Sequence, residues 1–143
     1  LHLTAHAGEW CGPDSVRGAL DDLDVERIGH GVRAIEDRAL VERLAETGVT
    51  LEVCPGSNVA LGLYPRLEKH PIARLRGAGV PVTVSTDDPP FFHTTMTGEY
   101  EGLARAFGWD DDDFRDLART AARAAFCDDA TRATLLKTLD DRT

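Results

Sequence analysis

Histidine and acidic residues recur directly after short apolar runs at three separate places in the sequence. His6 and Glu9 follow the first apolar run, His30 follows the second, and Asp87 and Asp88 follow the fourth. Neutral imidazole and carboxylate oxygen are ligands of Zn²⁺ and similar divalent ions. Two adjacent acids in one site would repel each other unless a cation lay nearby. If the fold brings these side chains together, their chemistry predicts a metal site in which protons are transferred.

Each of these residues also has an ordinary structural interpretation. A single histidine at a strand end is usually a hydrogen-bonded structural residue. Glu9 follows a glycine, in a context where an acid commonly begins a helix. Asp87 and Asp88 precede Pro89, which is typical of a turn. The functional interpretation therefore depends on the convergence of several residues and not on any one of them.

Several familiar catalytic motifs are absent from the sequence. It contains no H-E-x-x-H, no G-x-S-x-G, no G-x-G-x-x-G and no P-loop pattern. The order H-x-x-E at 6–9, with no second cysteine after Cys54, excludes the zinc deaminases that carry H-x-E and P-C-x-x-C. Cys54 is interpreted as a small buried apolar residue rather than a nucleophile. His70 and His93 are interpreted as structural residues, with His93 the nearer to a pocket rim.

Alternating strands and helices are predicted to position these residues. Parallel strands need a crossover between them, so this alternation predicts an α/β fold with a parallel sheet. After the last strand, only helices are predicted. The predicted strands cover residues 1–5, 25–28, 49–53 and 80–84, and the helices between them begin at Pro13, at Asp37 and near Pro71.

The carboxyl ends of parallel strands lie on one face, which is where such proteins place their active sites. The third predicted strand adds Ser57 and Asn58 to the residues already named. The strand ends would therefore collect two imidazoles, three carboxylates and an amide in one place.

Length and composition limit the class of protein further. The 143 residues fit a single domain over 1–143, and a net charge of −9 disfavours a nucleic-acid polymer as partner. No apolar run approaches the length of a membrane span, so we expect no membrane partner. Three scattered cysteines favour a reducing compartment, and we expect the protein to be cytoplasmic. The acidic run at 110–113 predicts a solvated helix start.

Four spaced motifs resemble the C-terminal half of the adenosine deaminase family. They are HAGE at 6–9, ERIGHGV at 26–32, LEVCPGSNVALG at 51–62 and STDDP at 85–89, and EY at 99–100 agrees with them. The resemblance implies the C-terminal half of a TIM (β/α)8 barrel, with four βα units and extra C-terminal helices. It also implies one catalytic zinc ion and hydrolytic deamination at the 6-position of a purine nucleoside, namely of adenosine to inosine and ammonia.

The resemblance also implies a role for each matching residue. His6 and Asp87 would be ligands of the zinc ion, and Asp87 would also hold the attacking water. Glu9 would protonate the ring nitrogen next to the attacked carbon. His30 would orient the attacking water and act as its base.

Gly8 and Asp88 would bind the substrate, with Asp88 hydrogen-bonded to the imidazole part of the purine. In this family, proteins specific for the free base tend to carry aspartate at the position of Gly29, so Gly29 favours a nucleoside. Deaminases of adenine or of a modified adenine nucleoside stay open as alternatives. A metal-dependent amidohydrolase that cleaves an amide is a further alternative.

The chain departs from the family pattern in one respect. The family's barrel begins with a strand that ends in H-x-H and supplies two more zinc ligands, and this sequence contains no H-x-H. Four βα units are half of an eightfold barrel. We therefore expect either the N-terminal half of the same barrel or a second copy to complete the fold. A catalytically inactive half-barrel that acts as a binding module is the alternative from another functional class.

Overall fold

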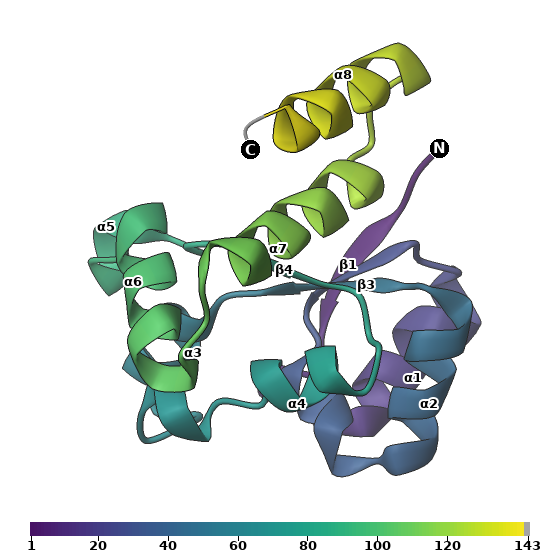
Figure 1. Cartoon of the computed structure of the whole chain (residues 1–143). Helices are drawn as coiled ribbons and strands as arrows, with labels where there is room; N and C mark the ends of the chain where they lie inside the picture. The colour runs from purple at the N-terminus through teal and green to yellow at the C-terminus, as the bar shows by residue number, and fades with distance from the viewer. Residues whose placement is uncertain (142–143) are drawn as a thin grey trace.

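The computed structural model describes residues 1–141 and contains one parallel sheet with helices around it (Figure 1). The strands pair in chain order, β1-β2-β3-β4, and every pair is parallel. His6 in β1 lies opposite Gly29 in β2, and Glu52 in β3 lies opposite Thr83 in β4. The strands are β1 (Thr4–Ala7), β2 (Arg27–His30), β3 (Thr50–Val53) and β4 (Val82–Val84).

Helices connect successive strands and then continue beyond the last one. In Figure 1, α3, α5 and α6 gather on one side and α1 and α2 on the other, while α7 lies against β4 and α8 projects beyond it. The connecting elements are α1 (Pro13–Leu23), η1 (Val32–Glu36), α2 (Arg38–Thr47), α3 (Pro55–Ala60), η2 (Leu67–Lys69) and α4 (Ile72–Gly77). The elements after β4 are α5 (Pro89–Phe92), α6 (Met96–Phe107), α7 (Asp111–Ala124) and α8 (Asp129–Asp140).

Local sequence signals set several helix ends. The Asp37 side chain accepts a hydrogen bond from the Leu40 backbone N–H at 3.1 Å and caps α2. Gly48 ends the same helix with a φ of 74°, a conformation that glycine adopts without steric cost. Asp110 and Asp113 form a reciprocal capping box at the start of α7. The predicted helix start in the acidic run is therefore confirmed.

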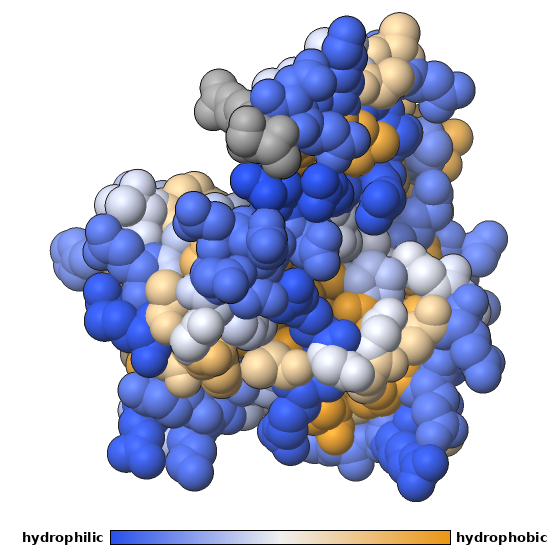
Figure 2. Space-filling view, viewed as in Figure 1, coloured by the Kyte–Doolittle hydropathy of each residue, from blue (hydrophilic) through white to orange (hydrophobic). Residues whose placement is uncertain are grey.

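The hydrophobic core lies between one face of the sheet and the helices. Ile28, Leu51 and Val53 from the strands are fully buried, and so are Leu40 and Leu44 from α2. Burying a side chain of this size contributes about 1.5–3 kcal/mol. Most of the hydrophobic stabilisation therefore comes from this outer layer. On the visible face, hydrophilic residues predominate over α7 and α8, with some hydrophobic residues on α8, and further hydrophobic residues gather around α4 (Figure 2).

The opposite, inner face of the sheet carries polar side chains. Thr4 donates its hydroxyl to Glu52 Oε2 at 2.9 Å, and Arg27 Nε lies 3.4 Å from Glu52 Oε1. The Arg27 guanidinium also stacks on the Phe126 ring, 3.6 Å from the ring centroid. Within residues 1–141, the Nε of Arg27 is buried and has no hydrogen-bond partner.

Short helices begin directly after two of the strands. Asp87 and Asp88 before Pro89 were interpreted as typical of a turn, yet Pro89 begins α5, and Pro55 likewise begins α3. Proline suits the first helical position because its missing N–H has no partner there and its φ is already helical. A strand end followed by proline is therefore a helix start here.

Among the residues that the structure describes, no helix is both long and apolar enough to cross a lipid bilayer.

The sheet has two unpaired edge strands, and these predict that the isolated 143-residue chain self-associates. β1 and β4 each pair with one strand only, so each leaves a row of backbone groups open to another strand. We expect sedimentation velocity on the purified chain to show dimers or larger assemblies. A stable, soluble monomer over the concentration range of the experiment would contradict this expectation.

Candidate active site at the carboxyl ends of the strands

His30 lies at the centre of the site. It is the last residue of β2 and is only 5% exposed. Its Nδ1 lies 3.6 Å from Glu9 Oε1, and its Nε2 lies 3.9 Å from Asp87 Oδ2. The His6 ring lies beside it, with 5.3 Å between the two ring centroids. The structure therefore brings together four of the residues that the sequence analysis selected.

The other two selected residues have different surroundings. Asp88 is exposed and occupies the position that precedes α5. Gly8 is buried, and its N–H donates to Ser15 Oγ at 2.9 Å. The Gly8 carbonyl accepts from the Arg33 N–H at 2.8 Å. The expected substrate contacts of Gly8 and Asp88 stay predictions.

The backbone is strained at two of the site residues. His30 has a φ of 63° and Asp87 a φ of 59°, in the left-handed region that favours glycine. A non-glycine residue in this region costs on the order of 1–3 kcal/mol and persists only where its surroundings hold it. These left-handed turns redirect the chain immediately beyond β2 and in the segment that follows β4, where the two side chains face each other.

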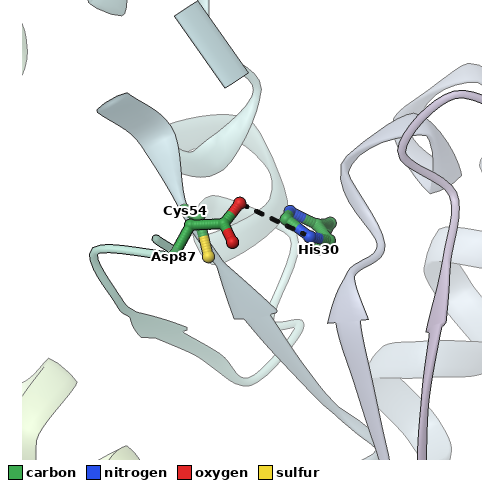
Figure 3. A group of neighbouring side chains, drawn as sticks. All are labelled: His30, Cys54 and Asp87. Atoms are coloured by element: carbon green, nitrogen blue, oxygen red, sulfur yellow. Dashed lines mark ion pairs between the residues drawn. The ribbon is translucent and has the colours of Figure 1, made fainter. Parts of the chain in front are cut away.

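Asp87 is fixed by a hydroxyl from the third βα unit. Ser57, fully buried in α3, donates its hydroxyl to Asp87 Oδ2 at 2.6 Å. Cys54 lies beside the same carboxylate, and Figure 3 shows the Asp87 carboxylate pointing toward the His30 ring with the Cys54 sulfur close by. Burial raises the pKa of the Cys54 thiol to about 12, with the nearby carboxylates adding to the effect. A thiol that stays protonated agrees with the interpretation of Cys54 as a buried apolar residue and not a nucleophile.

The donor atoms at this site fit a zinc ion. One donor atom each from His30, Cys54 and Asp87 lie within 4.8 Å of one another, and the His6 imidazole adjoins His30. Zinc in proteins takes nitrogen, oxygen and sulfur donors of these types. Because zinc binds cysteine as a thiolate and the Cys54 thiol stays protonated, the imidazoles and the Asp87 carboxylate are the donors that fit.

Gly29 allows His6 to reach its place. A Cβ atom built at residue 29 would lie 1.9 Å from His6 Cδ2, closer than any real contact. The two residues are opposite each other in the β1–β2 register. The absence of a side chain at Gly29 therefore has a steric reason within this chain, independent of the substrate.

Asn58 and His70 form a buried layer behind His30 and Glu9. Asn58 is fully buried and His70 is 2% exposed. Asn58 Nδ2 lies 3.4 Å from both His30 Nδ1 and Glu9 Oε1, and Asn58 Oδ1 lies 3.1 Å from His70 Nε2. Asn58 was expected at a strand end and His70 as a structural residue, and no local feature of the sequence links the two.

Burial of His70 predicts a pH dependence of stability. Desolvation lowers the pKa of the His70 imidazole from 6.5 to about 3. Between those two pH values the unfolded chain binds a proton that the folded chain does not. The free energy of unfolding therefore falls as the pH drops below about 6.5, by roughly 1.4 kcal/mol per pH unit from this group.

The variant His70→Gln removes this titration. Urea unfolding of the full-length protein at pH 7 and pH 5 should show a smaller loss of stability in the variant than in the unsubstituted protein. Tyr64 packs edge-on against His70 with 4.9 Å between ring centroids, so Tyr64→Phe is a matched control that should keep the original pH dependence. If all three proteins lost the same free energy of unfolding between pH 7 and pH 5, His70 would not be the source of the pH dependence.

Known proteins resemble this chain over nearly its whole length. The sequence model of the family described as Adenosine deaminase matches residues 1–142. An adenine deaminase of Rhizobium leguminosarum bv. trifolii is 58% identical over 139 residues, which are 97% of this chain and 43% of that protein. The chain thus spans less than half the length of this curated relative.

Solved structures agree in fold. The crystal structure of an adenine deaminase from Arthrobacter aurescens is 37% identical, with a TM-score of 0.95 over 99% of this chain and 43% of that one. A Burkholderia ambifaria amidohydrolase solved with bound Zn is 28% identical, with a TM-score of 0.85 over 99% of this chain and 42% of that one. The four βα units are therefore an α/β half-barrel, corresponding to part of a TIM-barrel deaminase. By sequence and by fold, the chain belongs to the adenosine deaminase family.

Proposed function

We propose that the protein containing this chain removes the 6-amino group of an adenine-type purine by zinc-dependent hydrolysis. The observation that supports this most strongly is the position of His30 between the carboxylates of Glu9 and Asp87. Such an arrangement offers one group to protonate a purine ring and others to hold a water molecule beside it. The family match and the zinc-type donor set point in the same direction.

Free adenine is the substrate that we propose first. The resemblance alone predicted adenosine, with Gly29 as a modest argument for a nucleoside. Because His6 packs closely against Gly29, the absence of a side chain at residue 29 has a steric explanation and no longer favours a nucleoside. The relative at 58% identity is named an adenine deaminase. Adenosine is the second candidate, because the matching family model is that of adenosine deaminase.

In the proposed reaction, water adds through its oxygen to C6 of the purine while Glu9 gives a proton to the adjacent ring nitrogen. His30 and Asp87 hold the water by hydrogen bonds, and the Asp87 carboxylate receives its proton. The proton taken from the water passes to the amino nitrogen, the C6–N bond breaks and ammonia leaves. The remaining hydroxyl proton returns to the Glu9 carboxylate, which leaves a C6 carbonyl. Proton transfer by positioned groups of this kind contributes about 10²–10⁴-fold to a rate.

His6 and Asp87 would hold the zinc ion, and the segment of the barrel outside this chain would supply the remaining ligands. When bound, zinc acts as a Lewis acid that makes water a nucleophile near neutral pH. Gly8 and Asp88 would contact the purine, Asp88 through its imidazole ring. Because the chain spans 43% of its relatives' length, these roles apply to the protein at full length.

Ammonia release by the full-length protein tests the proposal. We expect turnover of adenine to exceed that of adenosine, measured by the loss of ultraviolet absorbance and by ammonia formation. Glu9→Gln, which has nearly the same shape but cannot donate its proton in the same way, should lower kcat by about 10²–10⁴-fold. A wild-type protein that binds zinc and deaminates neither purine would contradict the proposed substrate class. A substoichiometric zinc content would favour a catalytically inactive module instead.

The contact between residue 29 and His6 gives a second test. In Gly29→Ala the added Cβ would displace the His6 ring, because it would lie 1.9 Å from Cδ2. We expect the zinc content, measured by mass spectrometry, to fall, and kcat/KM to drop by roughly 10–100-fold.

Gly77→Ala is the matched control, since a Cβ there meets nothing within 4 Å. It should keep full zinc content and activity. Full zinc occupancy in Gly29→Ala would show that His6 is not a ligand.

A further inference from the structure

A continuous set of hydrogen bonds runs from the start of α4 to the site. The Ile72 backbone N–H donates to His70 Nδ1 at 3.2 Å, and His70 Nε2 contacts Asn58 Oδ1 at 3.1 Å. Asn58 Nδ2 in turn contacts His30 Nδ1 and Glu9 Oε1, both at 3.4 Å. We call these residues (Ile72, His70, Asn58) the amide relay.

The Ile72 backbone N–H determines which nitrogen of His70 carries the proton, and His70 in turn determines the orientation of the Asn58 amide. A backbone N–H can only donate, so His70 Nδ1 must accept and the proton of neutral His70 must sit on Nε2. That Nε2–H then donates to Asn58, which places the oxygen of the amide toward His70. The NH₂ group of Asn58 consequently faces His30 and Glu9 and donates to both.

We propose that Asn58 and His70 are positioning residues that hold His30 with its proton on Nε2 and tie its ring to the Glu9 carboxylate. The proposal rests on the proposed deaminase function and deepens it. Because His30 Nδ1 accepts from Asn58, the neutral ring presents an N–H toward Asp87, whose Oδ2 lies 3.9 Å from Nε2. His30 is then a hydrogen-bond donor on the Asp87 side of the site.

The surroundings of the amide relay disfavour any other arrangement. If the Asn58 amide were reversed, its NH₂ would face the His70 Nε2–H, and its oxygen would face the Glu9 carboxylate. A buried donor or acceptor left unpaired costs about 1–3 kcal/mol. Burial also keeps His70 neutral, since its pKa is lowered to about 3, so Nδ1 stays an acceptor near neutral pH.

Nitrogen-15 spectra of the full-length protein with labelled histidine test the proton positions directly. We expect neutral His30 and His70 to show a protonated Nε2 and an unprotonated Nδ1. In Asn58→Asp, the new carboxylate cannot donate to His30 Nδ1, so the His30 proton should move to Nδ1. A His30 ring that already carries its proton on Nδ1 in the unsubstituted protein would overturn the proposal.

Kinetics of matched variants test the positioning role. Asn58→Asp should lower kcat/KM by roughly 10–100-fold, as loss of a partner that orients a site ligand usually does. His70→Leu removes the donor to Asn58 and should lower kcat/KM, whereas His70→Gln retains an N–H donor and should restore most of it. Tyr64→Phe is the packing control and should keep full activity, because Tyr64 contacts His70 only through its ring. Equal activity of His70→Leu and the unsubstituted protein would contradict the role of His70.

Two readouts keep the proposal separate from the proposed function and from misfolding. The nitrogen-15 spectrum reports proton positions whether or not the protein deaminates a purine, while turnover by the unsubstituted protein tests the function alone. Circular dichroism melting identifies any variant that fails to fold. If His70→Leu unfolds, the spectrum of the unsubstituted protein and the comparison of Asn58→Asp with Tyr64→Phe still decide the question.

Discussion

The parallel pairing of the four strands is the constraint on which the rest of the structure depends. Parallel strands direct their carboxyl ends to the same edge, and here each pair keeps that direction without exception. Residues 21 and 57 positions apart in the chain therefore meet: Glu9 with His30, and His30 with Asp87. Left-handed backbone at His30 and Asp87 then turns the chain sharply enough for their side chains to face each other.

The sequence predicted the architecture because its signals are local. The alternation of apolar runs with capped helices indicates a parallel sheet, and Asp37 and Gly48 delimit α2 as their chemistry requires. The convergence of His6, Glu9, His30 and Asp87 could be predicted for the same reason, since every strand end lies at one edge. Asp87 and Asp88 before Pro89 indicated a turn where a short helix begins, because proline favours both a turn and the first position of a helix.

The parts of the site that could not be predicted depend on contacts between distant segments. Nothing near Asn58 in the sequence shows that His70 approaches its oxygen, or that Ile72 fixes the proton on His70. In the same way, the steric need for Gly29 appears only when His6 is placed opposite it. The choice between a free base and a nucleoside depends on pocket walls beyond those of this chain, which spans 43% of its relatives' length.

The two faces of the sheet differ in chemistry, because polar side chains lie on the inner face and the hydrophobic core lies on the outer one. Thr4, Arg27 and Glu52 contribute charge and hydrogen bonds to the space beneath the site, while the apolar layer that maintains the fold lies on the other side of the same strands. The two faces of the same strands thus have separate roles: the outer residues pack the helices against the sheet, and the inner residues form hydrogen bonds and ion pairs. Barrels of this kind place their reacting groups at the carboxyl ends of the strands, so the chemistry can differ from one barrel to another while the packed layers stay the same.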